Sequence, residues 1–278
     1  MLKKTRKLIT DSMLGLSASL LLLLFSATQV MAAALSGDND TAWTVDGADT
    51  VAANSVLGGT GKAAIFDQSG AGATTTSLTV TGAGTANVGD ITVIGPDHSG
   101  DVADLVIGDG SAATIFIING SVTGNAVGGV AGNDLDISMI GVNAGAGAQQ
   151  LKFFGNVDAE TGLISSGDAN GINTITFGNG SDAMTFAGTI GMGAAGVASV
   201  DILTLAAGAT ISGDIDLAVN GGATLVINLA AGSAITGAIS DTANATLVTI
   251  NVDGSAEISG TVDTGTTADT VIAIDDNM

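Results

Sequence analysis

Pairs of carboxylates are the residues whose spacing most directly suggests chemistry. Asp214 and Asp216 alternate with apolar residues, as do Asp134 and Asp136, so each pair is expected on one side of a β-strand. Two carboxylates placed in this way can act as the acid and base of a glycosidase. Outward acids on a strand more often serve solvation, and only 3% of the residues are aromatic and able to stack on a sugar. We therefore assign no catalytic residue and expect a protein that is not an enzyme.

The single histidine is the second candidate. His98 lies close in sequence to Asp97, Asp101 and Asp104, and an imidazole with carboxylates can bind a divalent cation. One histidine among acids in a Gly- and Ser-containing segment is a weak constellation, so we favour a polar loop between strands. A lone histidine without a nucleophile motif also gives no support for a catalytic triad.

Two further patterns do not recur at a fixed position. Residues 58–63 (GGTGKA) begin like a calcium-binding repeat, but Ala63 stands where that repeat has Asp. Thr-x-Thr pairs begin at Thr79 and Thr174 and are interpreted as ordinary outward strand residues. We expect no cofactor and no specific metal site, with weak Ca²⁺ binding by surface acids left open.

The charge distribution excludes nucleic acid as a partner. The formal net charge is −21, and beyond residue 7 the only basic residues are Lys62 and Lys152. Proteins that bind nucleic acid or anionic lipid need Lys and Arg to neutralise phosphate. The chain has no cysteine, which excludes a disulfide scaffold and a thiolate metal site.

Residues 1–32 have the three parts of an export signal. Lysines and one arginine come first, an apolar run that includes LLLLLF follows, and Val30-Met31-Ala32 precedes the expected cleavage before Ala33. The apolar run is short for a membrane-spanning helix, and no later segment is long enough. We expect an exported protein without a membrane span in its mature chain, with an uncleaved anchor as the alternative.

A repeat of about 23 residues organises the remaining chain and is most regular in residues 184–278. The motif recurs as TISGDI (210–215), AITGAI (234–239) and EISGTV (257–262), with the central glycines 24 and 23 residues apart. Apolar and polar residues alternate within each copy, which indicates strands with one buried face.

The repeat predicts an all-β fold, a single-stranded parallel β-helix (β-solenoid) with coils of about 23 residues. Residues 33–60 are expected to form an N-terminal cap, and residues 61–278 the solenoid. An antiparallel β-sandwich is the competing architecture. The stacking predicts inward ladders and one outward ladder: Leu203/Ile227/Ile250 and Ile211/Ile235/Ile258 inside, and Asn228/Asn251 outside.

The motif [ATE]-I-[ST]-G-x-[IV], followed after about ten residues by a second strand ending in Asn, resembles passenger domains of autotransporters, especially rickettsial-type surface antigens. The resemblance covers most of residues 60–278. It implies a right-handed parallel β-helix on the outer membrane, used for adhesion. The sequence departs from that family because it ends in IAIDDNM and has no tyrosine, whereas autotransporters carry a membrane β-barrel with aromatic girdles.

The function expected from these features is a structural or adhesive β-solenoid at a bacterial cell surface or outside the cell. Its partners would be a host or cell-surface receptor, or further copies joined through an open C-terminal coil. A self-assembling extracellular fibre or matrix subunit is the alternative, and a glycan-active β-helix enzyme is a third reading.

Overall fold

The computed structural model describes only part of the chain. All of the described residues belong to the compact unit Ser36–Met278. The predicted signal peptide 1–32 lies outside them. The described residues are 42–45, 47–52, 62–69, 73, 75–95, 101–108, 112–124, 135–140, 148–166, 172–194, 200–217, 224–240, 247–263 and 269–275.

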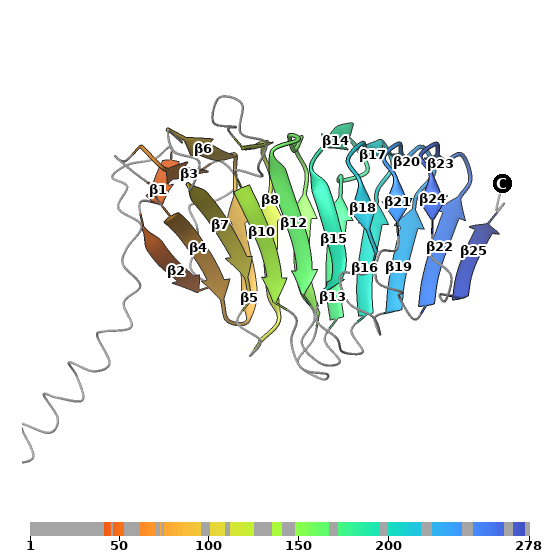
Figure 1. The fold of residues 1–278 in the computed structure, drawn as a ribbon, viewed down its shortest axis with the longest axis horizontal. Helices are drawn as coiled ribbons and strands as arrows, with labels where there is room; N and C mark the ends of the chain where they lie inside the picture. Colours follow the sequence, from red (N-terminus) through yellow and green to blue (C-terminus); the bar gives the residue numbers. More distant parts are fainter. Residues whose placement is uncertain are drawn as a thin grey trace, which may run out of the picture. The chain divides into compact units, whose positions relative to one another are not determined.

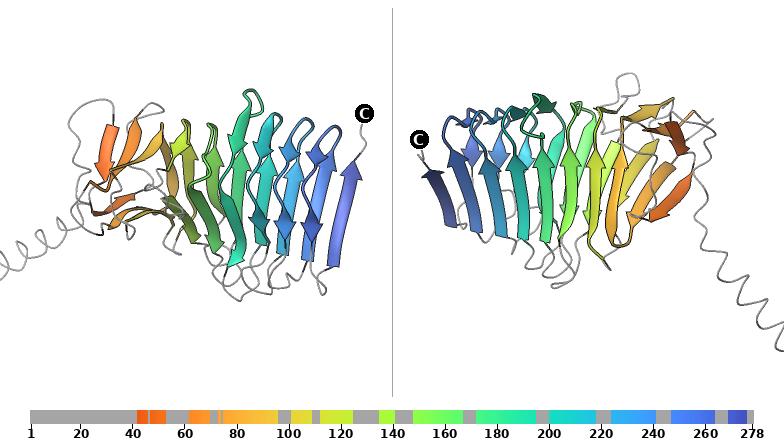
Figure 2. Two further views of the ribbon diagram at one scale, coloured as in Figure 1. Left: turned by 45° about the horizontal axis from the view of Figure 1, so that its top comes forward. Right: turned by 180° about the vertical axis from the view of Figure 1, so that it is seen from behind.

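The fold is a β-solenoid, as the repeat predicts. Every regular element among the described residues is a β-strand, and every strand pairing there is parallel (Figure 1). An antiparallel sandwich is therefore excluded. Following the sequence, the chain passes in turn along three faces, here called A, B and C, and then begins the next coil. Figure 2 shows from two further sides that strands of neighbouring colour lie side by side.

Face A consists of short strands. Two isolated bridges, Val122 to Val157 and Val157 to Phe186, join its two sheets. In stacking order its strands are β1 (Ala42–Val45), β3 (Ala63–Asp67), β6 (Ile91–Ile94), β9 (Val122–Thr123), β14 (Met184–Phe186), β17 (Ala209–Ile211), β20 (Ala234–Ile235) and β23 (Glu257–Ile258).

Face B is one continuous sheet of nine strands. In stacking order they are β2 (Ala48–Ala52), β4 (Thr75–Thr81), β7 (Val102–Ile107), β10 (Leu135–Ile140), β12 (Thr161–Ser166), β15 (Thr189–Ala194), β18 (Ile215–Asp216), β21 (Ile239–Ser240) and β24 (Val262–Asp263). Strands β1 and β2 pair in register with β3 and β4. Residues 42–52 of the expected cap therefore belong to the stack, and a capping role for 33–60 stays a prediction.

Face C is one continuous sheet of eight strands. They are β5 (Gly84–Val88), β8 (Thr114–Ile118), β11 (Gln149–Phe153), β13 (Ile172–Phe177), β16 (Val200–Leu205), β19 (Thr224–Leu229), β22 (Leu247–Asp253) and β25 (Asp269–Asp275).

Coil length differs between the two halves of the chain. Leu247 pairs with Asp269, 22 residues on, whereas Ile115 pairs with Gln150, 35 residues on. The mean spacing is about 26 residues, so the predicted 23 fits the C-terminal coils and is too short for the N-terminal ones. The difference arises mostly between faces A and B, where residues 95–101 and 124–134 replace connections as short as 212–214.

The motif TISGDI forms two strands. Ile211 ends β17 on face A and Ile215 begins β18 on face B, with Gly213 in the bend between them. Both isoleucines are fully buried. A Cβ on Gly213 would overlap the carbonyl oxygen of Gly188 in the previous coil. The recurrent glycine is therefore explained by the close approach of successive coils at this bend.

The core is formed by the inward residue of each alternating pair. The predicted ladder Leu203, Ile227 and Ile250 is fully buried and in register. In the other ladder Ile211 and Ile235 are fully buried, and Ile258 in the last coil is only half-buried. Alternation thus predicted the buried positions, and burial weakens only at the final coil.

Three phenylalanines fill the core in the middle of the stack. Phe177 stacks on Phe153 with ring centroids 5.3 Å apart, and Phe186 meets Phe177 edge to face at 4.9 Å. All three side chains have 0% exposure. Their packing joins faces A and C across the inside of the coil, because Phe186 belongs to β14 whereas Phe153 and Phe177 belong to β11 and β13.

Candidate functional site

Asp104 and Asp136 form a pair of acids on a sheet surface. They occupy paired positions on β7 and β10 of face B, so their side chains lie one strand spacing apart, about 4.8 Å. The sequence pattern had paired Asp136 with Asp134 along one strand instead. Asp134 lies outside the described residues. The cross-strand pair was not recognised because it depends on a 32-residue register that the sequence does not display.

Both carboxyls of this pair have raised pKa values. Partial burial raises the pKa of Asp104, and burial together with the charge of Asp104 raises the pKa of Asp136. The two acids compete for ionisation, as expected for like charges on adjacent strands. The next outward positions in this row are Ser77 and Gly162, so the pair sits between uncharged neighbours on an open sheet face.

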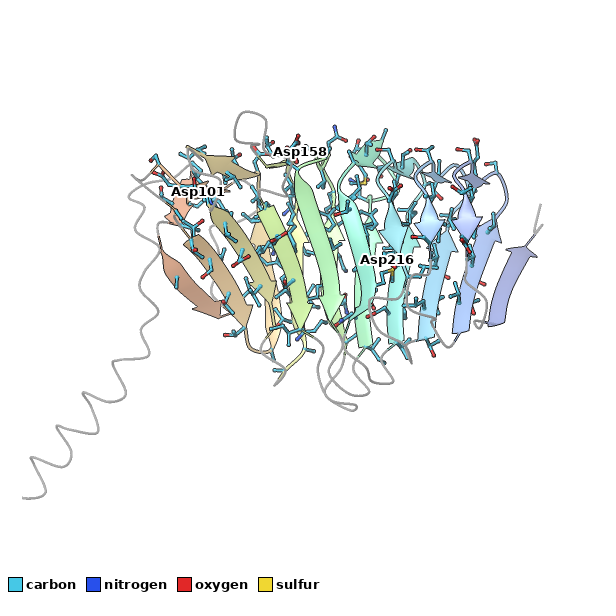
Figure 3. All side chains as sticks on the ribbon, in the orientation of Figure 1. Asp101, Asp158 and Asp216 are labelled. Atoms are coloured by element: carbon cyan, nitrogen blue, oxygen red, sulfur yellow. The ribbon has the colours of Figure 1, made fainter. Side chains whose placement is uncertain are left out.

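The expected loop around His98 is only partly described. His98 and Asp97 lie outside the described residues. Asp101 directly precedes β7, and Asp104 is a strand residue of β7. Asp104 therefore belongs to the face B pair. Figure 3 shows Asp101, Asp158 and Asp216 at separate places along the stack.

A second acidic position lies at the bend between faces A and B. Asp158 Oδ1 accepts a hydrogen bond from Thr161 Oγ1 at 3.0 Å. Burial raises the pKa of Asp158, and the nearby charge of Glu160 adds to this, while hydrogen bonds from Gly124, Thr161 and Glu160 oppose it. The carboxylate accepts hydrogen bonds within its own bend and from Gly124 of the previous coil, which is a structural role.

The predicted pair Asp214 and Asp216 flanks the buried Ile215. Asp214 is exposed, and its Oδ1 accepts a hydrogen bond from the backbone N–H of Ala238 in the next coil at 2.8 Å. Asp216 is half-buried on face B, one coil from Gly191 and one from Ser240. Asp214 thus connects two coils.

Side-chain oxygens make the same kind of contact at other coils. Asp90 Oδ1 accepts from the N–H of Ser121 at 2.7 Å, and Asn156 Oδ1 accepts from the N–H of Thr185 at 2.8 Å. The predicted outward asparagine ladder is confirmed, because Asn251 Nδ2 donates to Asn228 Oδ1 at 2.7 Å. Side-chain hydrogen bonds of this kind therefore connect successive coils at several points along the stack.

A row of polar side chains was missed by the sequence reading because it points inward. It occupies paired positions at the start of the face C strands. Gln149 Oε1 accepts from the N–H of Thr114 at 2.7 Å, and Gln149 Nε2 donates to Ala112 O at 3.0 Å. Asp201 shares strand parity with the buried Leu203, and this signal could have identified it. The row consists of Thr114, Gln149, Asn173 and Asp201, each with 0% exposure.

Face C has a different outward surface from faces A and B. Its two central outward rows contain Thr, Ile, Val, Asn and Gln, with Lys152 as the one charged residue among their described members. The first row is Thr85, Ile115, Gln150, Thr174, Ile202, Val226 and Thr249, and the second is Asn87, Ile117, Lys152, Thr176, Thr204, Asn228 and Asn251.

Acids are concentrated on the other two faces. Face B carries Asp104, Asp136, Asp216 and Asp263 on its outward side, and face A with its adjoining bends carries Asp67, Asp90, Asp158 and Glu257. The ends of the face C strands also carry acids, Asp253 at the end of β22 and Asp269 and Asp275 at the two ends of β25. The net charge of the chain is thus unevenly distributed around the coil.

The described residues contain neither a cluster of metal ligands nor a long apolar helix. No group of three or more His, Cys, Asp or Glu side chains in this part of the chain could hold a metal ion. Nor does this part contain a helix long and apolar enough to cross a membrane. The chain matches no protein-family model, no curated protein and no solved structure.

Proposed function

We propose that this protein is exported and serves as a non-catalytic structural or adhesive β-solenoid at a bacterial cell surface or in the extracellular space. It would work as an autotransporter passenger domain does, by presenting repeated side chains on a stiff support. The sequence of residues 1–32, with its basic start, apolar run and small residues before Ala33, supports export.

The observation that carries the proposal is that hydrogen bonds connect each coil to the next. Parallel sheets run through every described coil, and side chains such as Asn228, Asp214 and Asn156 add hydrogen bonds between coils. A repeat protein held in this way presents equivalent side chains at regular intervals, so many weak contacts with one target can act together. Such multivalent contact is the physical basis of adhesion by a repetitive surface.

The test follows export and attachment separately. The full chain is expressed in a bacterium, the mature N-terminus is determined by mass spectrometry, and the cell surface and medium are assayed for the protein. Cleavage before Ala33 and binding of the exported protein to host cells or to matrix proteins are expected. Retention of the protein in the cytoplasm, or turnover of a polysaccharide from a substrate panel, would contradict the proposal.

A second function, a self-assembling fibre subunit, is favoured by the last described coil. Val262 occupies an inward register position opposite Ile239, yet it is 40% exposed, and Ile258 is only half-buried. Within the described residues, β25 lies at the edge of face C, and exposed strand edges pair with other chains. Filaments that lengthen with protein concentration would support end-to-end assembly, and short particles of constant size would contradict it.

A further inference from the structure

We infer that face C is a lateral docking surface for a second copy of this chain. In the resulting dimer the outward sides of two C sheets pack against each other. The inference is independent of the adhesive role and of end-to-end assembly, because it concerns the side of the coil and not its last strand.

The distribution of acidic side chains favours face C as the contact surface of a dimer. Two copies that each carry a net charge of −21 repel each other, and the repulsion is strongest where acids of both copies approach. Faces A and B present several acids each. In contrast, the central rows of face C present Lys152 alone among their described charged side chains. The central rows of face C are therefore where two copies can approach without placing carboxylates against carboxylates, since Asp253, Asp269 and Asp275 lie at the ends of the last two strands.

The outward side chains are also suited to packing. Ile115, Ile117 and Ile202 lie in the central rows, Ile172 beside them is 40% exposed, and Val226 continues the first row. β-Branched side chains on a continuous sheet give a flat surface of fixed rotamers, which loses little entropy on packing. Sheets that pack face to face lie about 10 Å apart with such side chains interdigitating.

The available area meets the requirement of a stable interface. Eight strands at about 4.8 Å spacing give a length of about 35 Å, and five or six residues at about 3.3 Å give a width of about 18 Å. Each copy then contributes about 600 Å², or about 1,200 Å² for the pair. This value reaches the lower limit of specific interfaces, about 1,200 Å². It is the area of a flat sheet, and the projecting side chains add further surface.

The exclusion of water is what would hold the pair together. Thr176, Thr204 and Thr249 can exchange hydrogen bonds with water for hydrogen bonds across the interface, while the isoleucines and Val226 contribute apolar burial. Higher salt should therefore strengthen the dimer, because it screens the repulsion between the acidic faces and leaves apolar burial intact.

The test uses two matched substitutions in the exported full chain. Thr204→Asp places a carboxylate in the centre of face C, and Thr210→Asp places the same carboxylate on face A. Both threonines are half-buried, outward strand residues. A two-fold interface repeats each substitution, so we expect Thr204→Asp to raise the dissociation constant of the dimer at least tenfold. Thr210→Asp should change it less than twofold.

The measurement is sedimentation velocity over a protein concentration series at low and high NaCl. A dimer that tightens with salt and is lost in Thr204→Asp supports the inference. Monomers at all concentrations, a dimer that salt dissociates, or a dimer equally stable in both variants would each overturn it. Thr176→Asp on β13 replaces Thr204→Asp if that variant fails to show a native β circular dichroism spectrum.

A second measurement uses the absence of cysteine from the sequence. Thr204→Cys and Thr210→Cys each introduce a single thiol for reaction with a bulky maleimide. Cys modification at position 204 should slow at least tenfold when the protein is concentrated, whereas modification at position 210 should not. Protection at position 204 by a neutral polysaccharide, without dimer formation, would assign face C to a glycan and overturn the inference.

Discussion

The recurrent glycine at the bend between faces A and B supports a prediction that separates two physical reasons for a glycine in this fold. Gly237 and Gly232 are five residues apart in the same coil. A Cβ on Gly237 would overlap Gly213 O and lie 3.0 Å from Ser212 O, both in the previous coil. A Cβ on Gly232 would meet nothing within 4 Å, but its φ is +78°. The first glycine is required by space and the second by backbone conformation.

The two alanine substitutions should therefore differ in cost. Gly232→Ala forces a left-handed conformation on an L-residue, which costs about 1–2 kcal/mol. Gly237→Ala must push two coils apart. This move disrupts the bonds Thr236 N–H to Ile211 O and Ala238 N–H to Asp214 Oδ1, both 2.8 Å long. Two lost bonds at about 1 kcal/mol each and overpacking of about 1–3 kcal/mol give about 3–5 kcal/mol.

The assay is urea unfolding followed by far-UV circular dichroism, together with hydrogen exchange of peptides from each coil. Because a coil contacts only its neighbours, exchange in Gly237→Ala should accelerate mainly in the coils around β17, β20 and β23. If Gly237→Ala costs no more than Gly232→Ala, the close approach of successive coils is not what requires glycine at this bend.

Three other predictions follow from the packing and the charges. Phe177→Ala should cost about 3–5 kcal/mol of unfolding free energy because it opens a cavity between Phe153 and Phe186; Phe177→Leu should recover much of the loss, and equal losses in denaturant titrations would contradict the packing. Asp136→Asn should raise the melting temperature at pH 7 and leave it unchanged at pH 3. The pKa of Asp136 is raised in the folded state, so its ionisation lowers stability as pH rises above the unfolded value near 3.8; a stabilisation that persists at pH 3 would show that charge is not the cause. Asn228→Ala should cost about 0.5–1.5 kcal/mol, because it removes the acceptor of Asn251 Nδ2, and an unchanged unfolding midpoint would show that the asparagine ladder adds no stability.

The sequence predicted the coil where side-chain parity and glycine spacing agree. Alternation identified Leu203, Ile227 and Ile250 as inward and Asn228 as outward, because a period of two assigns every strand residue to one side. The same alternation continues through the bend in TISGDI, so the bend could not be recognised in the sequence. A three-residue corner keeps Ile211 and Ile215 on the inside, so two strands look like one in the sequence.

The candidate surfaces were harder to predict than the core. Neighbours across coils depend on register, and the register of the N-terminal half includes connections of unequal length such as 124–134. The Asp104–Asp136 pair and the two acid-free rows of face C appear only when that register is known. Sequence spacing alone placed Asp104 with His98 and treated the threonine pair at Thr174 as unrelated to later coils.

The unequal connections between faces A and B also determine where this chain can accept new sequence. Strands β9 and β10 each keep the register of their own sheet although residues 124–134 connect them. In contrast, β17 and β18 are joined only by 212–214, whose glycine lies against the coil before it. A tag or epitope inserted into 124–134 can leave every strand in register. One residue added to 212–214 would shift the strand that follows by one position and turn its buried side chains outward. The N-terminal coils are therefore the part of this protein in which evolution or an engineer can add a recognition loop without rebuilding the stack.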